Sequence, residues 1–116
     1  MTNPDCLFCR IAAGGIPATI VHQDDLIVAF RDIAPQAPTH ILLIPREHLA
    51  DVPDLTEAHG ELLARLMTTA TRLAADDGID ETGFRLVTNT GRDAGQSVAH
   101  LHWHLLGGRP MAWPPG

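Results

Sequence analysis

Histidines alternate with large apolar residues near the C-terminus, and this pattern constrains the fold more than any other feature of the chain. Leu101 and Trp103 separate His100, His102 and His104. Because successive side chains of a β-strand point to opposite faces, this spacing places three imidazoles on one surface and the apolar side chains on the other. The sequence therefore predicts a strand with one buried face and one polar face.

Four further apolar, β-branched runs, each bounded by Gly, Pro, Asp or Asn, also predict strands. Together with Val98–Leu106 they give five, the others being Thr19–His22, Leu26–Arg31, His40–Pro45 and Phe84–Thr88. Apolar residues at three- and four-residue spacing between the third and fourth strands predict a long helix, with Thr56 as N-cap and Gly78 as C-cap.

A shorter helix is expected over Cys6–Ala13, because glycines and a proline follow it. Strands outnumber helices and do not alternate with them, which favours an antiparallel sheet covered by helices, an α+β fold. We expect one domain over residues 1–116. Residues 107–116, rich in proline, form a C-terminal tail that cannot continue a strand.

Size and composition restrict the class of protein. The chain has 116 residues, 45% of them hydrophobic, enough for the core of one modest domain. Its net charge of −6 argues against nucleic acid as a partner, because such binding draws on a basic surface. No run approaches the ~20 apolar residues that cross a bilayer. With only two cysteines and no basic segment before an apolar run, we expect a cytoplasmic protein with no membrane partner.

The row of histidines can be the solvent-facing side of an edge strand, or it can contain metal ligands. His100 and His104 begin about 13 Å apart at a rise of ~3.3 Å per residue, whereas Zn–N bonds are ~2.0–2.1 Å long. One ion cannot bind all three rings without distorting the strand. The histidines are therefore expected to divide between different tasks.

Cys6 and Cys9 form a C-x₂-C pair, which is half of a tetrahedral zinc site and needs two further ligands. Histidines are the candidates for those ligands. A redox pair is a second interpretation, although that motif normally follows a strand and no strand is predicted before residue 6. Two buried, unbonded thiols are the third.

The loop Asn89–Ser97 precedes the histidines and contains Gly91 and Gly95. Backbone N–H groups, the Ser97 hydroxyl and the amides of Asn89 and Gln96 can approach an anion there. A plain turn between strands is the other interpretation. The loop is neither a P-loop nor a dinucleotide-binding fingerprint, because it leads into a strand and lacks G-K-[ST].

The segment His100-Leu101-His102-Trp103-His104-Leu105-Leu106 resembles the His-φ-His-φ-His-φ-φ motif, where φ is apolar, of the histidine triad (HIT) superfamily. Within that superfamily the chain resembles the histidine triad nucleotide-binding (Hint) proteins. The stretches that carry this second resemblance are Asp32–His40, Ile44-Pro45, Gly95–Val98 and Gly107–Gly116. The resemblance covers nearly the whole chain.

The resemblance implies the HIT fold, a five-stranded antiparallel sheet with one long and one short helix that dimerises into a ten-stranded sheet. It also implies a hydrolase similar to adenosine 5′-monophosphoramidase. Such an enzyme releases AMP or GMP from purine nucleoside 5′-phosphoramidates and related P–N, P–S or anhydride substrates, through a covalent nucleotidyl-histidine intermediate. The implied partners are a purine nucleotide and a second copy of the chain.

Matching positions carry the implied roles. His102 corresponds to the nucleophile, His104 to a residue that binds the phosphate and the leaving group, and His40 to one that orients and relays protons. Asp32 matches the carboxylate that holds the ribose. The other matched positions are Asn89, Gly95, Gln96 and Ser97 at the phosphate, Phe8, Ile11, Phe30 and Ile33 at the base, and Trp113, a candidate for reaching the neighbouring protomer's site.

The chemistry of imidazole agrees with these roles. A neutral imidazole can attack phosphorus and give an N–P bond that water cleaves, while a neighbouring imidazole gives and regains the proton of the leaving group. No metal is required for that reaction. Relatives with a complete C-x₂-C pair imply instead a structural zinc site, here formed by Cys6, Cys9, His48 and His100.

Other functions stay open. A dinucleoside polyphosphate hydrolase or a nucleotidyl transferase would belong to the same superfamily. Transferases of the hexose-1-phosphate uridylyl kind carry glutamine where this chain has His104, and the Trp113–Gly116 ending favours the Hint branch. A nucleotide-binding regulatory protein with incidental turnover is the alternative from another class. The intact His40, Asp32 and Ser97 beside the triad favour retained catalysis.

Overall fold

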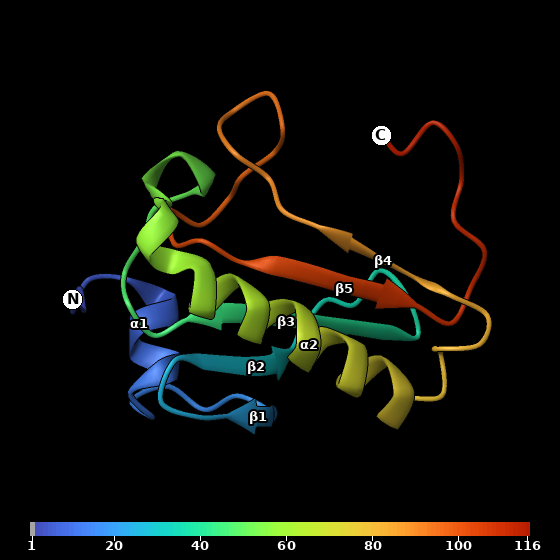
Figure 1. The fold of residues 1–116 in the computed structure, drawn as a ribbon, viewed down its shortest axis with the longest axis horizontal. Helices are drawn as coiled ribbons and strands as arrows, with labels where there is room; N and C mark the ends of the chain where they lie inside the picture. The colour runs from blue at the N-terminus through green and yellow to red at the C-terminus, as the bar shows by residue number, and fades with distance from the viewer. Residues whose placement is uncertain (1) are drawn as a thin grey trace.

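The computed structural model describes residues 2–116 and contains one five-stranded sheet with a helix on each face (Figure 1). The strands are β1 (Ile20–Gln23), β2 (Ile27–Arg31), β3 (Thr39–Pro45), β4 (Phe84–Val87) and β5 (Trp103–Gly107). Neighbouring strands are all antiparallel, in the order β1-β2-β3-β5-β4. The predicted α+β architecture is confirmed.

The long helix α2 (Gly60–Asp76) covers one face of the sheet (Figure 1). A short 3₁₀ turn, η2 (Glu57–His59), leads into it, and the Thr56 hydroxyl caps that turn by accepting a hydrogen bond from the N–H of Ala58. Gly78, with a φ of 74°, ends the helix and lets the next N–H reach the carbonyl of Ala74. Thr56 therefore caps the turn that precedes α2, whose own N-cap is His59, and the C-cap of α2 is Asp77, one residue before the predicted Gly78.

Two apolar clusters lie on opposite faces of the sheet. Alternate residues of β2 and β3, such as Ala29 and Leu43, pack under α2. The residues between them, such as Phe30 and Leu42, pack against Phe8 of the short helix α1 (Leu7–Ala12). Because β2 and β3 are covered on both faces, their sequences read as continuous apolar runs.

The last strand is shorter than predicted. β5 begins at Trp103, whereas the sequence predicts a strand from Val98. The N–H of Leu101 donates to the carbonyl of Leu49, which lies beyond the end of β3, so this stretch approaches the sheet without joining its ladder. The predicted division of faces still holds, because Leu101 and Leu105 join the cluster under α2 while His100 and His102 contact Phe8.

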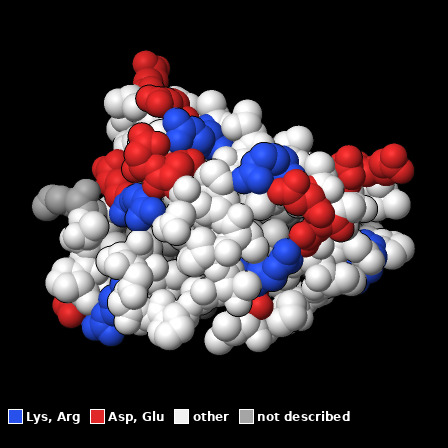
Figure 2. All heavy atoms as spheres, turned by 90° about the horizontal axis from the view of Figure 1, so that it is seen from below, with Lys and Arg blue, Asp and Glu red and all other residues white. Residues whose placement is uncertain are grey.

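The charged groups of the surface are intermixed. On the face shown in Figure 2, basic and acidic side chains gather over one part and leave much of the rest uncharged. Among the described residues, Arg65 forms ion pairs with Asp24 and Asp25, and Arg72 with Asp76. No helix within residues 2–116 has the length and apolar character to span a membrane. A second short 3₁₀ element, η1 (Val52–Asp54), lies between β3 and η2.

Candidate functional site

A cavity of about 420 Å³ lies between α1 and the sheet, within the usual size range of small-molecule sites. Its walls are apolar at one end, where Phe8 meets Phe30 edge to face with ring centroids 5.5 Å apart. Asp32, Ser97, His102 and His104 supply polar groups. The complete lining is Leu7, Phe8, Ile11, Ile16, Pro17, Ala18, Phe30, Arg31, Asp32, Ile33, Leu42, Ser97, Val98, His102 and His104.

His102 is buried and held in one orientation. Its Nδ1 lies 2.7 Å from the carbonyl oxygen of His100, so Nδ1 carries the proton and donates it to that oxygen. The other ring nitrogen, Nε2, then has a lone pair and makes no hydrogen bond to another described residue. Because the ring lines the cavity, His102 offers a basic nitrogen to a ligand.

His104 has the opposite character. The N–H of Gln36 donates to Nδ1 of His40 at 3.0 Å, which leaves the proton of His40 on Nε2. That Nε2 lies 2.9 Å from Nδ1 of His104 and donates to it, so the proton of His104 is on Nε2. His104 therefore offers an N–H group to the cavity, beside the lone pair of His102, with ring centroids 5.0 Å apart.

Burial keeps the rings of His40 and His104 uncharged. Burial, followed by the neighbouring imidazoles of His102 and His40, lowers the pKa of His104 to about 4. Burial also lowers the pKa of His40, and the attraction of the Asp32 carboxylate opposes the change. In the free protein at neutral pH, both His40 and His104 are therefore neutral.

Asp32 directly follows β2 and lies beside His40, which is hydrogen-bonded to His104. One carboxylate oxygen accepts a hydrogen bond from the N–H of Ala34 at 2.8 Å, and the other is 3.5 Å from Nε2 of His40. Asp32, His40 and His104 bring possible ligand atoms within 4.8 Å of one another. The hydrogen bond between the two rings already uses the facing nitrogens, so this group is a proton network rather than a metal cage.

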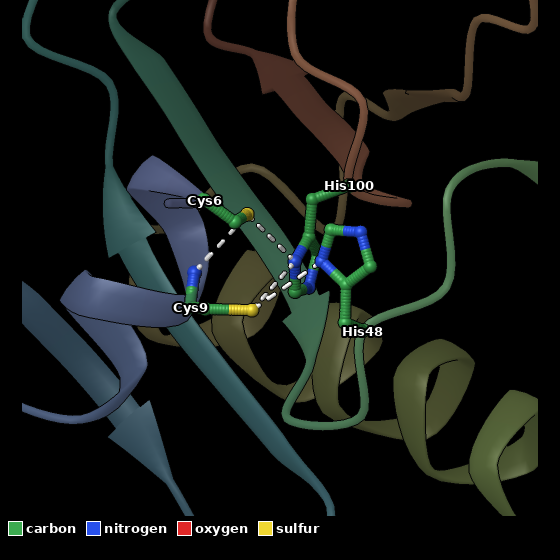
Figure 3. A group of neighbouring side chains, drawn as sticks. All are labelled: Cys6, Cys9, His48 and His100. Atoms are coloured by element: carbon green, nitrogen blue, oxygen red, sulfur yellow. Dashed lines mark hydrogen bonds between the residues drawn. The ribbon is translucent and has the colours of Figure 1, made fainter. Parts of the chain in front are cut away.

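Cys6, Cys9, His48 and His100 converge behind the cavity (Figure 3). The Sγ of Cys9 lies 3.4 Å from Nδ1 of His48 and 3.5 Å from Nδ1 of His100, and the Sγ of Cys6 lies 3.3 Å from the same His100 nitrogen. All four ligand atoms lie within 4.8 Å of one another. Of the three histidines in the row, only His100 belongs to this cluster, so the row is divided, as its spacing predicts.

The geometry and chemistry of this cluster fit zinc. Tetrahedral bonds of ~2.3 Å to sulfur and ~2.0–2.1 Å to nitrogen separate the two kinds of ligand by about 3.6 Å. The observed sulfur–nitrogen distances approach this value. Nε2 of His100 donates to the carbonyl of Pro45 at 2.8 Å, which leaves Nδ1 as the metal-binding nitrogen, and such a second hydrogen bond is typical of a ligating histidine.

Most of the predicted nucleotide residues line the cavity, and some do not. Those that line it are Phe8, Ile11, Phe30, Asp32, Ile33, Ser97, His102 and His104. His40 stands behind His104. Asn89, Gly95, Gln96 and Trp113 lie outside the lining. The Gln96 amide accepts a hydrogen bond from the N–H of Gly91 in its own loop and donates one to the carbonyl of Ala50, which follows β3.

Sequence reasoning missed several residues of the apolar wall. Leu7, Leu42 and Val98 line the cavity, and so does the segment 16–18. Leu42 was identifiable as part of a strand, and the burial of both strand faces is the signal that it points away from α2. The segment 16–18 has no regular structure, so its position depends on contacts that its own sequence does not reveal.

Comparisons with known proteins agree with the fold and the histidine pattern. Residues 13–111 match the HIT domain family. The crystal structure of a HIT family hydrolase from Legionella pneumophila superimposes with a TM-score of 0.94 at 54% identity, covering 97% of this chain and 100% of that one. The fold and the site thus define a histidine triad protein, and the chain belongs to the HIT family.

Two relatives are informative about chemistry. The purine nucleoside phosphoramidase of Escherichia coli is 50% identical over 107 residues, covering 92% of this chain and 90% of that protein. The 14 kDa zinc-binding protein of Brassica juncea is 50% identical over 114 residues, covering 97% of this chain and 100% of that protein. The name of the first relative describes a phosphoramidase, and the name of the second describes zinc binding.

Proposed function

We propose that this protein is a purine nucleoside phosphoramidase of the Hint kind, which releases AMP or GMP from 5′-phosphoramidates and related nucleotidyl compounds. One observation carries the proposal: His102 presents a lone pair and His104 an N–H group, side by side in the same cavity. Displacement at phosphorus needs such a nucleophile and proton donor. The likeness to the phosphoramidase of Escherichia coli supports the reaction class.

The cavity suits a nucleotide in a particular direction. The base lies between the apolar side chains of Phe8, Ile11, Phe30 and Ile33, where burial of its faces supplies affinity. The Asp32 carboxylate accepts hydrogen bonds from the ribose hydroxyls. The 5′-phosphate lies at Ser97 and the two histidines, and the loop of Asn89, Gly95 and Gln96 closes around it.

In the first step, Nε2 of His102 attacks phosphorus and an N–P bond forms. The bond from phosphorus to the leaving nitrogen breaks, and His104, which is protonated on both ring nitrogens in the substrate complex, gives its Nε2 proton to that nitrogen and becomes neutral. An anionic phosphate favours the protonated form of a neighbouring imidazole, so substrate binding raises the pKa of His104 from about 4 toward that of a useful acid. Burial of the ring lowers the pKa of His104, and the negative charge of the bound substrate raises it.

In the second step, water attacks the same phosphorus. The N–P bond breaks, its electron pair returns to Nε2 of His102, and His104 takes a proton from the attacking water. The products are AMP or GMP and the free amine, and both histidines regain their starting forms. The 2.9 Å hydrogen bond from His40 holds the His104 ring in the required orientation.

The experiment that tests the proposal is mass spectrometry of protein quenched shortly after mixing with adenosine 5′-phosphoramidate. We expect a mass gain of one adenylyl group that maps to His102. His102→Asn keeps the N–H that donates to the His100 carbonyl but lacks a nucleophilic Nε2. It should therefore bind AMP and show neither adduct nor turnover.

A His59→Ala variant is the matched control, because His59 lies outside the cavity lining and contacts Thr56 and Glu47 instead. It should form the adduct as wild type does. Nucleotide binding with neither an adduct nor AMP release would favour the regulatory-protein alternative. AMP release without an adduct would contradict the covalent mechanism alone.

We also assign structural zinc to Cys6, Cys9, His48 and His100. The sulfur–nitrogen distances and the outer hydrogen bond of His100 support this assignment, and so does the likeness to the Brassica juncea zinc-binding protein. Bound there, zinc would supply a cross-link between α1 and the sheet. Metal analysis of the purified protein tests the assignment, and absence of zinc from folded, metal-replete protein would contradict it.

A homodimer completes the proposal. β4 is an edge strand, so its outer side is available for another chain, and Trp113 is 82% exposed. A tryptophan this exposed is suited to packing on a partner, and we place it at the neighbouring protomer's site. Light scattering tests the dimer. Removal of residues 113–116 should change substrate preference, and an unchanged preference would count against the role of Trp113.

A further inference from the structure

Helix α1 serves two sites at once. Cys6, its N-cap, and Cys9 face the cysteine–histidine cluster, while Leu7 and Phe8 between them line the cavity. The helix has only six residues, far fewer than the ~12–15 that an isolated helix needs for even marginal stability. Its position therefore depends on packing and on whatever holds its two cysteines.

His100 also serves both sites. Its Nδ1 faces the two cysteine sulfurs, and its carbonyl oxygen accepts the hydrogen bond from Nδ1 of His102 at 2.7 Å. The side chain is completely buried. The Phe8 ring stands next to both histidines, with centroids 6.0 Å from His100 and 5.1 Å from His102. A change at His100 is thus transmitted to the orientation of His102 without passing through solvent.

We propose that metal binding at Cys6, Cys9, His48 and His100 and nucleotide binding in the cavity strengthen each other, with Phe8 and His100 as the positioning residues that link the two sites. The inference rests on the proposed function, since it takes the cavity to bind a nucleotide. It adds regulation of that site: the supply of zinc sets the affinity for nucleotide.

The energetic reason lies in what fixes α1. Without metal, weak hydrogen bonds between thiols and imidazoles connect α1 to His48, which follows β3, and to His100, which precedes β5. Coordination replaces these contacts with strong bonds and orders the wall that carries Phe8. A nucleotide that binds to an already ordered wall bears less of the ordering cost, and so binds more tightly.

The coupling is reciprocal. If zinc strengthens AMP binding by some factor, AMP must strengthen zinc binding by the same factor. Coupling energies of this kind correspond to factors of roughly 5–150, and we expect about tenfold for a link through one short helix and one peptide carbonyl. Two independent measurements therefore report the same quantity.

The first measurement is the AMP affinity, by calorimetry, of protein loaded with zinc and of protein freed of it. We expect the zinc-free protein to bind AMP about tenfold more weakly. His48→Ala removes a metal ligand that lies outside the nucleotide cavity, and it should match the zinc-free protein whether or not zinc is added. His22→Ala is the control, because His22 contacts Asp24 and Arg72 instead, and it should respond to zinc as wild type does.

The second measurement is the zinc affinity of the folded protein, by competition with a chelator of known affinity. Zinc should bind about tenfold more tightly when AMP saturates the cavity. In nucleotide-free protein, the ring ¹⁵N signals of His102 should shift when zinc is added to wild type and stay unchanged in His48→Ala. A merely stabilising role of the metal would not move these signals.

The outcomes separate the two proposals. Equal AMP affinities with and without zinc, or a zinc affinity that AMP leaves unchanged, overturn the coupling while the hydrolase stands. A zinc-loaded protein that neither binds AMP nor releases it from adenosine 5′-phosphoramidate overturns the proposed function, and the coupling with it. A protein that turns over substrate but never binds zinc overturns the coupling alone.

Discussion

Acidification should destabilise this fold through His104, and replacing His104 with glutamine should remove that part of the pH dependence. The pKa of His104 is lowered from 6.5 to about 4 in the folded protein, with burial as the largest cause. An unfolded chain restores the ordinary value, so between these pH values the unfolded state binds the proton more readily. The stabilisation is therefore complete above pH 6.5 and is lost as the pH falls toward 4.

The magnitude follows from linkage. At about pH 5, a shift of this size corresponds to about 2 kcal/mol of preference for the unfolded state. His104 is only partly buried, so solvent screens the effect and we expect about 1 kcal/mol to remain. The neighbouring ring of His40, whose pKa is also lowered, adds its own dependence in wild type and variant alike. Comparison of the two proteins thus isolates His104.

Urea unfolding at neutral pH and at about pH 5 measures the effect. The free energy of unfolding of wild type should fall by about 1 kcal/mol more than that of His104→Gln. His59→Gln removes a histidine that contacts Thr56 and Glu47 instead of the cavity histidines, and it should lose as much stability as wild type does. The cluster of Cys6, Cys9, His48 and His100 is the same in all three proteins, so its contribution cancels in the difference. An equal loss of stability in wild type and His104→Gln would refute the reasoning.

Three further substitutions probe the metal cluster, the loop and the core. Cys9→Ser should lower the melting temperature by roughly 5–10 °C in calorimetry of zinc-loaded protein, because it removes a ligand, and an unchanged temperature would argue against bound metal. Gln96→Ala frees the loop from Ala50 and should raise KM roughly tenfold with little change in kcat; steady-state kinetics would show the reverse if Gln96 acts in the chemical step. Gly107→Ala places a methyl group against Ile79 and should cost about 1–3 kcal/mol in urea unfolding, while no loss would mean that Ile79 moves freely.

Local patterns were sufficient to predict the elements. The short helix ends within a residue of its predicted limits, and the first four strands start and stop within a residue of theirs. The error lies at Val98–His102, where the alternation of side chains persists but the backbone bonds elsewhere. The carbonyl of Leu49, distant in sequence, accepts the N–H of Leu101, and no pattern around residue 100 indicates this contact. Periodicity reports which side of a chain is buried and does not report hydrogen-bond partners.

The candidate site was predictable in its residue types and not in its proton positions. The C-x₂-C pair and the row of histidines identify two groups of candidate ligands, and the distance between His100 and His104 predicts that the row divides between them, whereas only the family resemblance singles out His100 as the metal ligand. The hydrogen-bond partners of Gln96 could not be predicted from the sequence. An amide beside a glycine loop suits a phosphate, yet in the structure it bonds Ala50 and Gly91 and shapes the loop instead. A polar side chain's first partner is set by the backbone groups nearby.

Backbone groups decide what each histidine can do. The carbonyl of Pro45 takes Nε2 of His100 and leaves Nδ1 for a metal, while the carbonyl of His100 takes Nδ1 of His102 and leaves Nε2 for a ligand. The N–H of Gln36 sets the proton of His40, which in turn puts the proton of His104 on the nitrogen opposite their shared hydrogen bond. In the proposed function, these four chemically identical side chains act as a metal ligand, a nucleophile, an orienting group and a proton donor. His100 contributes a ring nitrogen to the cysteine–histidine cluster and a carbonyl to His102, so one residue connects the cluster with the cavity.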